Sequence, residues 1–415
     1  MSQTKKTTKA LYNYGGGMRG LIPAHIMTRI EETTGLRMAE MVDIFSGPST
    51  GAILNAALTM PHPDHPGKPK YRARHLVRFY EREGINIFPQ DRFRELRGMV
   101  HDFNNRTLKL NQLNALFRHG HYDPAHLGKA LRALYGDSRL SGSLSSLIIP
   151  TYNIDRPPVV VETVEENADH LIVKNRFLDE GGHAVWLKNI RTGVPFGEEK
   201  KVPGVALYDA VMASCAAPTY YPCHHFKVDY PDRRGAVSLS GIDGIVYDNP
   251  CITYLGAVRE HVPADHRLVM LVLGTGYTNK PVKKEDWNRY GSLGVVDPVN
   301  DLPLINIFFH ASESALMESF SREMAGNAYV FNKSMLTNAG KPGEPSLEID
   351  DASPDNLKAL QRFAESIIEE EKQQFEELCH LLAGNRDRKE EQKDKKTIRH
   401  SIQYYVNKIS GRASA

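Results

Sequence analysis

The chain has 415 residues, of which 41% are hydrophobic and 25% are charged, and its formal net charge at pH 7 is +2. Such a chain can bury a large core, in one large domain or in two smaller ones. The nearly balanced charge excludes a general electrostatic attraction to nucleic acid, so we expect no nucleic-acid partner, and any attraction to an anionic surface must be local.

Four cysteines without a C-x-x-C pair are too few to crosslink so long a chain, which suggests a reducing compartment. The first ten residues are polar and basic with no apolar segment behind them, so we expect no secretory signal peptide. No apolar run approaches the roughly 18 residues that a transmembrane segment requires. These features predict a cytoplasmic protein that is soluble or peripherally bound to a membrane.

The N-terminal part of the chain predicts two strand–turn–helix units in succession. The expected elements are a strand over 9–14, a glycine-rich turn over 15–20, a helix over 21–34, a strand over 41–46 and a small-residue helix over 50–60. Strand, tight turn and helix repeated in this order indicate a parallel sheet in an α/β fold.

Residues 61–144 differ from their surroundings, because they are polar and rich in arginine and histidine. We expect them to form a helical insertion that covers the end of the sheet. Further along the chain we expect strands over 145–154, 157–163 and 266–276, and helices over 205–215, 249–261 and 303–325. A serine and a proline at 353–354 then favour the start of one long amphipathic helix through residue 382.

The last segment, residues 385–415, combines an excess of basic residues with apolar residues at helical spacing, among them Ile398, Ile402 and Tyr405. This pattern is typical of a helix that lies on an anionic membrane surface. It equally fits a helix whose apolar face packs on the rest of the protein or on a second subunit.

The sequence Gly47-Pro48-Ser49-Thr50-Gly51 has the G-x-S-x-G spacing of a nucleophile elbow. These five letters are common in loops, so their position has to decide. They lie at the junction between a predicted strand and a predicted helix, where an elbow would expose a serine beside the positive end of the helix dipole. Ser49 is therefore a candidate nucleophile.

The glycine-rich turn, Gly15 to Gly20, lies at the end of the preceding strand and can supply main-chain N–H groups to an oxyanion. The same letters also spell the dinucleotide fingerprint G-x-G-x-x-G. That fingerprint requires an acidic residue at the end of the second strand, whereas Asp43 falls within the strand. Dinucleotide binding and a purely structural turn stay open as alternatives.

Five segments in order resemble the patatin-like lipid acyl hydrolases. They are YGGGMRGLIP, DIFSGPSTGAIL, ASCAAPTYYP at 213–222, IDGIVYDNP at 242–250 and VLGTG at 272–276. The resemblance implies a three-layer α/β fold with a mainly parallel central sheet flanked by helices. It implies a catalytic domain over 8–335 and a closing amphipathic helix within 336–384 packed on it. The composition adds the helical insertion over 61–144 within that domain and the basic amphipathic tail over 385–415.

The resemblance also implies a catalytic Ser-Asp dyad without histidine, metal or cofactor. Ser49 would be the nucleophile and Asp243 the general base, and the oxyanion hole would come from the main chain of Gly15, Gly16, Gly17, Met18 and Arg19. The implied substrate is a fatty-acyl ester of a phospholipid or another glycerolipid, reached by peripheral contact with a membrane.

Two positions depart from the family pattern. Tyr14 stands where the family usually has aspartate directly before the glycines, and Ile245 stands where a second glycine often follows the base. These departures leave the support of the oxyanion loop and the turn around Asp243 open.

Four other readings remain. A Ser-Asp-His triad would require His261, His266 or His310. A metal at Cys223-His224-His225 is disfavoured, because adjacent histidines in an extended segment point to opposite faces. An inactive domain that binds lipid or a protein partner, and an enzyme switched on by a small-molecule or protein activator, complete the set.

Overall fold

The structure is a computed structural model that describes residues 6–89, 122–155, 182–192, 202–218, 220–230, 235–278, 281–295, 303–324 and 326–384. The expected strand over 157–163 and the tail over 385–415 lie outside the described residues. Among the described residues, no helix has both the length and the hydropathy that crossing a membrane would require.

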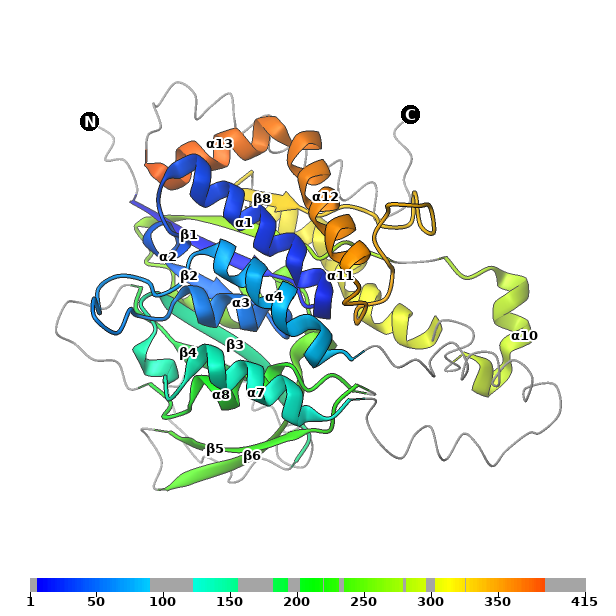
Figure 1. Ribbon diagram of the computed structural model, residues 1–415, viewed down its shortest axis with the longest axis horizontal. Helices are drawn as coiled ribbons and strands as arrows, with labels where there is room; N and C mark the ends of the chain where they lie inside the picture. The colour runs from blue at the N-terminus through cyan, green and yellow to red at the C-terminus, as the bar shows by residue number, and fades with distance from the viewer. Residues whose placement is uncertain are drawn as a thin grey trace, which may run out of the picture.

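One sheet organises the described part of the chain (Figure 1). Its strands are β1 (Lys6–Asn13), β2 (Ile44–Ser46), β3 (Ser146–Asn153), β4 (His183–Asn189), β5 (His224–Asp229), β6 (Ala236–Asp243), β7 (His266–Leu273) and β8 (Ala328–Phe331). Their order is β5-β6-β3-β2-β1-β7-β8, and β4 also pairs with β3. Strands β3, β2, β1, β7 and β8 are parallel, whereas β4 and β6 run antiparallel to β3 and β5 runs antiparallel to β6. The expected mixed α/β fold with a mostly parallel central sheet is confirmed.

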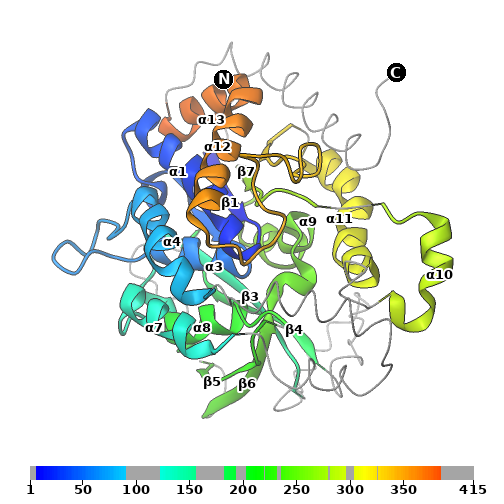
Figure 2. The same cartoon turned by 45° about the vertical axis from the view of Figure 1, so that its right-hand side comes forward.

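Helices cover both faces of this sheet (Figure 2). The α-helices are α1 (Leu21–Thr34), α2 (Met38–Met41), α3 (Thr50–Leu58), α4 (Ala73–Ile87), α7 (Pro124–Tyr135), α8 (Leu207–Ser214), α9 (Pro250–Thr253), α10 (Lys284–Gly294), α11 (Pro303–Met324), α12 (Pro354–Glu370) and α13 (Lys372–Ala383). Short 3-10 or π segments are η1 (Gly17–Gly20), η2 (Leu140–Gly142), η4 (Gly244–Tyr247), η5 (Tyr254–Val258) and η6 (Arg259–His261). One group of helices is linked by successive contacts: α1, α3, α4, α7, α8, α12 and α13. A second group consists of α9 and α11, which contact each other, and α11 also contacts β7.

Local patterns explain the first units well. Helix α1 buries Ile22, Ile26 and Ile30, which recur every four residues, and it ends at Gly35 in the left-handed conformation with a φ of 74°. The expected boundaries of α1 are confirmed. Helix α3 is buried along its whole length, and its small residues allow it to lie close to the sheet.

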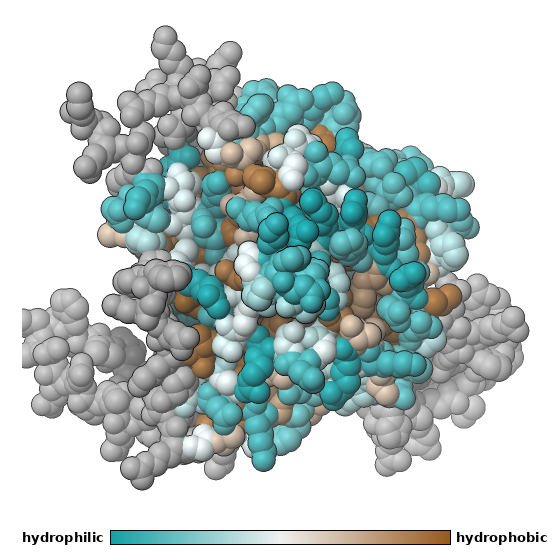
Figure 3. All heavy atoms as spheres, turned by 60° about the vertical axis from the view of Figure 1, so that its left-hand side comes forward, coloured by the Kyte–Doolittle hydropathy of each residue, from teal (hydrophilic) through white to brown (hydrophobic). Residues whose placement is uncertain are grey.

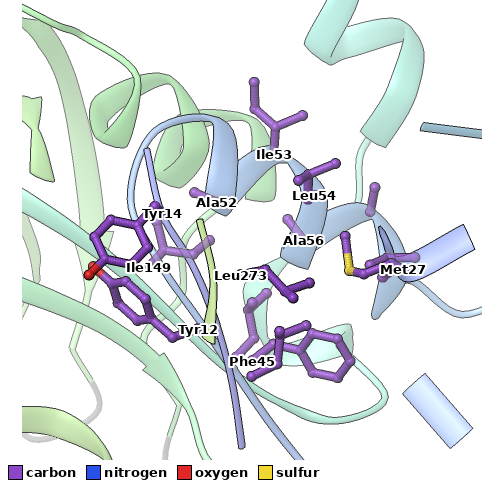
Figure 4. Close-up of a cluster of buried hydrophobic side chains, with 14 of the residues drawn as sticks. Tyr12, Tyr14, Met27, Phe45, Ala52, Ile53, Leu54, Ala56, Ile149 and Leu273 are labelled. Atoms are coloured by element: carbon purple, nitrogen blue, oxygen red, sulfur yellow. The ribbon is translucent and has the colours of Figure 1, made fainter. Parts of the chain in front are cut away.

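The core lies between the sheet and its helices. Figure 4 shows a part of it, where side chains of α3 meet those of the sheet and of α1: Tyr12, Tyr14, Met27, Phe45, Ala52, Ile53, Leu54, Ala56, Ile149 and Leu273. Figure 3 shows one outer face, on which hydrophilic side chains predominate and smaller apolar areas lie between them, as is usual for a folded domain.

The structure differs from the expectations in several places, among them residues 249–261, where one expected helix is a short α-helix followed by π and 3-10 segments. The long helix expected over 354–382 is two helices, because Glu371 leaves the helical conformation with φ −107° and ψ 30°. The antiparallel strands β4, β5 and β6 were not predicted, because polar residues interrupt their apolar runs. The two described helices of the insertion, α4 and α7, pack on one another within a helical layer. That the insertion covers the end of the sheet stays a prediction.

Candidate active site

The turn after β2 places Ser49 in a backbone conformation that side chains rarely adopt. Its φ of 54° and ψ of −125° make it the only non-glycine residue with positive φ in the described part of the chain. The neighbouring glycines are required by a close approach of β1. A Cβ atom at Gly47 would lie 1.9 Å from the carbonyl oxygen of Asn13, and one at Gly51 would lie 2.2 Å from it. The G-x-S-x-G segment is thus a strained strand-to-helix turn pressed against β1.

Asp243 reaches the same place from the opposite direction along β3. Strand β4 occupies one edge of β3, so β2 and β6 share the other edge. Strand β2 runs parallel to β3 and its last pair is Ser46 with Ile148, while β6 runs antiparallel and its last pair is Asp243 with Thr151. The two strands therefore end facing each other, and the elbow with Ser49 and the carboxylate of Asp243 meet at this gap.

The C-terminal end of α8 holds both sides of the gap. The N–H of Ser49 donates to the carbonyl oxygen of Ser214 at 3.1 Å and to its Oγ at 3.0 Å, and this Oγ donates to the carbonyl oxygen of Pro150 at 2.6 Å. The N–H of Asp243 donates to the carbonyl oxygen of Ala216 at 3.0 Å. One short segment thus fixes the main chain of Ser49 relative to that of Asp243.

Burial makes Asp243 a stronger base than an ordinary carboxylate. The residue is 0% exposed, and this burial raises its pKa from 3.8 to about 7, while the Ser49 hydroxyl and the N–H of Ile245 act in the opposite direction. Its Oδ1 accepts the Ile245 N–H at 2.9 Å, and its Oδ2 has no hydrogen-bond partner of normal geometry in the part of the chain that the structure describes. The Ser49 hydroxyl therefore lies near this carboxylate without closing a hydrogen bond, as is common before substrate binds.

The glycine-rich turn lies directly beside Ser49. A Cβ atom added to Gly15 would lie 3.3 Å from the Cβ atom of Ser49. Gly17 has a φ of 55°, and a Cβ atom there would lie 2.3 Å from the carbonyl oxygen of Ile349. Side chains at these positions would thus fill the space beside the serine or collide with the loop before α12.

Hydrogen bonds within the turn leave two of its N–H groups without an acceptor. The N–H of Gly15 donates to Oδ2 of Asp248 at 2.8 Å and that of Met18 donates to the carbonyl oxygen of Ile349 at 2.7 Å. The N–H of Arg19 donates to the carbonyl oxygen of Gly16 at 3.1 Å. The N–H groups of Gly16 and Gly17 donate to nothing in the described residues. Of the five residues expected to form an oxyanion hole, these two have N–H groups left for a ligand.

The Arg19 side chain is buried within the protein. Its Nη1 lies 3.5 Å from the sulfur of Met335, and no carboxylate among the described residues forms an ion pair with it. Burial lowers the pKa of this guanidinium to about 10. The site therefore carries a desolvated positive charge next to the glycine turn.

The histidines proposed for a triad have other surroundings. His266 begins β7, where its Nδ1 lies 2.8 Å from the hydroxyl of Thr8. The site is at the far end of this strand, about 23 Å away at the usual rise per residue. Nε2 of His261 lies 3.0 Å from a carboxylate oxygen of Glu260. The side chain of His310, in α11, is outside the described residues.

The neighbouring histidines of β5 do not converge on a metal. His224 contacts Asp209 through Nε2 at 3.0 Å, whereas His225 contacts Ser240 through Nδ1 at 3.1 Å. Over the described ranges, no group of three or more histidine, cysteine, aspartate or glutamate side chains is arranged to hold a metal ion.

Asp43 does not support the dinucleotide alternative. It lies just before β2, and its Oδ2 accepts the N–H of Lys9 at 2.7 Å. A ribose-binding acid must lie at the other end of the strand, beside the glycine turn.

Two polar residues of the site were not singled out by the sequence, Asp248 and Thr275. Both bind Gly15, through its N–H and its carbonyl oxygen respectively. They lie in the segments YDNP and VLGTG, but nothing in those letters indicates contact with a glycine near the N-terminus.

Comparisons with known proteins show what the chain is similar to. A family model described as patatin-like phospholipase matches residues 14–255. The chain is 27% identical to patatin-like protein 2 of Arabidopsis thaliana over 378 residues, which cover 85% of this chain and 81% of the relative. Patatin-11 of Solanum tuberosum is 22% identical over 378 residues, covering 85% and 82%. The structure of human GIVD cytosolic phospholipase A2 aligns with 91% of this chain and 60% of that chain, with 12% identity and a TM-score of 0.35, too low to support an argument.

Proposed function

The chain belongs to the patatin-like phospholipase family, and on that premise we propose that it hydrolyses fatty-acyl esters of glycerolipids with Ser49 as nucleophile and Asp243 as general base. The observation that carries this proposal is the meeting of the strained Ser49 turn with the buried carboxylate of Asp243 where β2 and β6 end along β3. Among the described residues, the histidines offer no alternative base at this gap.

The reaction proceeds in two steps. Oδ2 of Asp243 accepts the proton of the Ser49 hydroxyl, and the serine oxygen attacks the ester carbonyl. The N–H groups of Gly16 and Gly17 donate to the oxyanion, with the N-terminal end of α3 adding to the positive potential. The carboxylic acid of Asp243 then protonates the leaving alcohol. In the second step the Asp243 carboxylate accepts a proton from the water that attacks the acyl-enzyme, and it returns this proton to Ser49 as the bond to the acyl group breaks and the fatty acid leaves.

The electrostatics of the site fit this assignment. A carboxylate with an ordinary pKa near 4 is a weak base toward a serine hydroxyl. Burial raises the pKa of Asp243 to about 7, which matches it better to proton transfer near neutral pH. The buried guanidinium of Arg19 adds positive charge beside the glycine turn.

Substitution of the dyad tests the proposal. Ser49→Ala and Asp243→Asn should each abolish release of fatty acid from phospholipid, and the double variant should be little worse than either single one, because the two residues act as one unit. A fluorophosphonate should label the wild-type protein at Ser49, label Asp243→Asn much more slowly and leave Ser49→Ala unlabelled. Full activity of a folded Asp243→Asn would contradict the dyad.

A second candidate is an inactive or activator-dependent domain that binds lipid or a protein partner. Tyr14 in place of the usual aspartate motivates this alternative. Fatty-acid release from mixed liposomes, with and without candidate activators, separates the three cases. Release without an activator supports a constitutive enzyme, and release that requires one supports a switched enzyme. Binding to liposomes without any release supports the inactive domain.

A further inference from the structure

Two side chains from distant parts of the chain hold Gly15 on opposite sides. Oδ2 of Asp248 accepts the Gly15 N–H at 2.8 Å, and Oγ1 of Thr275 donates to the Gly15 carbonyl oxygen at 2.6 Å. They follow Gly15 by 233 and 260 residues. Neither residue has a role in the proton transfers or the nucleophilic attack proposed above.

The bond from Thr275 determines where the next N–H points. The peptide between Gly15 and Gly16 is planar, and in a trans peptide the N–H points opposite to the carbonyl. Because the carbonyl of this peptide is directed at Thr275, the Gly16 N–H is directed away from Thr275. The contact is tight, since a Cβ atom at Gly16 would lie 2.6 Å from Oγ1 of Thr275, and Thr275 is buried.

Asp248 anchors the other side of Gly15 to the sheet. Its second carboxylate oxygen, Oδ1, accepts the hydroxyl of Tyr12, which is fully buried in β1. The ring of Tyr12 packs edge-on against Tyr14, with ring centroids 5.2 Å apart. Tyr14 is thus buried against Tyr12 before the glycines, and the carboxylate comes from the segment after Asp243.

We propose that Asp248 and Thr275 are positioning residues of the oxyanion hole. They clamp Gly15 so that the N–H groups of Gly16 and Gly17 face the carbonyl that Ser49 attacks, an assignment that rests on the proposed function. The carbonyl of Gly16, which accepts the Arg19 N–H, orients the Gly17 N–H by the same rule of peptide planarity.

Thr275 offers the cleanest test, because valine keeps its shape and serine keeps its hydroxyl. In Thr275→Val we expect kcat to fall about 100-fold, the effect of losing one oxyanion-hole donor, with KM little changed. Thr275→Ser should retain kcat within about tenfold of the wild type, because one neutral hydrogen bond is preserved. A structural role alone would not separate kcat from KM or distinguish valine from serine.

Asp248→Ala should show the same loss of kcat, whereas Asp248→Asn keeps an oxygen for the Gly15 N–H and should lose less. Asp286→Asn is the matched control, since Asp286 lies on α10 and pairs with Arg289 at 2.8 Å on the surface. This control should have the kcat of the wild type. If Asp248→Ala fails to fold, the Thr275 pair still decides.

Wild-type kcat in a folded Thr275→Val would overturn the proposal. Backbone hydrogen exchange over residues 14–20 provides a readout that does not depend on hydrolysis. Exchange of the Gly15 amide, whose N–H donates to Asp248, should be faster in Asp248→Ala and Thr275→Val than in the wild type, and unchanged exchange in both would also overturn the clamp. An inactive and unlabelled wild type would instead contradict the dyad, so the two failures are distinguishable.

Discussion

At the scale of single residues, Ser49 combines the chemistry of the site with backbone strain. A φ of 54° with ψ of −125° is readily accessible only to glycine. The turn is held by main-chain bonds to Ser214 and by the close approach of Asn13 to the flanking glycines. The surrounding fold therefore compensates for a conformation that is unfavourable in itself.

Relief of this strain should be measurable. Ser49→Gly should raise the free energy of unfolding by about 1 kcal/mol relative to Ser49→Ala, because glycine adopts the turn without strain. Urea denaturation of the two inactive variants measures the difference. Equal stability of the two variants would mean that the turn relaxes when the hydroxyl is removed.

The raised pKa of Asp243 predicts the pH dependence of activity. A general base acts only when deprotonated, so kcat/KM should rise with pH through an apparent pKa of about 7 and level off above it. Hydrolysis of a short-chain soluble ester between pH 5 and 9 measures this profile. A midpoint near 4 would indicate a hydrated, ordinary carboxylate.

The same shift predicts that Asp243→Asn stabilises the protein at alkaline pH. The carboxyl binds its proton more tightly in the folded state than in the unfolded state, so the wild type loses stability as pH rises from about 4 to about 7. The full loss is about 4 kcal/mol for a shift of this size. The gain in melting temperature of Asp243→Asn over the wild type should therefore be larger at pH 8 than at pH 5. A gain independent of pH would argue against the shifted carboxyl.

At the scale of elements, α12 and α13 pack along α1 (Figure 1). Helix α12 begins at Ser353, whose Oγ accepts the N–H of Asn356, and it buries Leu360, Phe363 and Ile367. Helix α13 ends at Gly384 in the left-handed conformation, with a φ of 78°. The two helices thus have their own N-terminal and C-terminal caps, and the tail begins at the next residue, 385.

The tail is proposed to dock on anionic membrane. Truncation after Gly384 should weaken sedimentation with anionic vesicles, because each basic residue near such a surface contributes about 1 kcal/mol. Hydrolysis of a soluble short-chain ester should be retained. Neutral vesicles serve as the control. Unchanged vesicle binding with a lower melting temperature would show instead that the tail packs on the protein.

At the scale of the whole molecule, the sheet separates a functional end from a structural end. The glycine turn and the elbow follow the C-terminal ends of β1 and β2, as is usual in α/β sheets. Asp43, His266 and Thr8 lie at the opposite end, where hydrogen bonds join neighbouring strands. The residues that we assign to the reaction therefore lie at one end of the sheet, and Asp43, His266 and Thr8 stabilise the fold at the other end.

The proposed dyad predicts the result of a histidine scan. His261→Ala, His266→Ala and His310→Ala should each retain activity within about tenfold, whereas loss of a true general base would cost a hundredfold or more. Initial rates of ester hydrolysis, compared at equal folded fraction, measure the effect. A large loss in one of them, with Asp243→Asn still active, would put a triad in place of the dyad.

The sequence by itself determined what depends on local pattern. The apolar spacing of α1, the glycines around Ser49 and the order of five motifs indicated the α/β fold and the family, and both are confirmed. These features can be recognised in the sequence alone, because helix periodicity and positive φ are properties of neighbouring residues.

Only the tertiary structure decided what depends on pairing and burial. Strand β6 could reach Ser49 only by taking the same edge of β3 as β2, and no local pattern encodes that choice of partner. The shift in the pKa of Asp243 comes from the exclusion of water by the packed chain around it. The acceptor for the Gly15 N–H is likewise a carboxylate distant in sequence, because folding brings Asp248 to a position that chain order does not reveal.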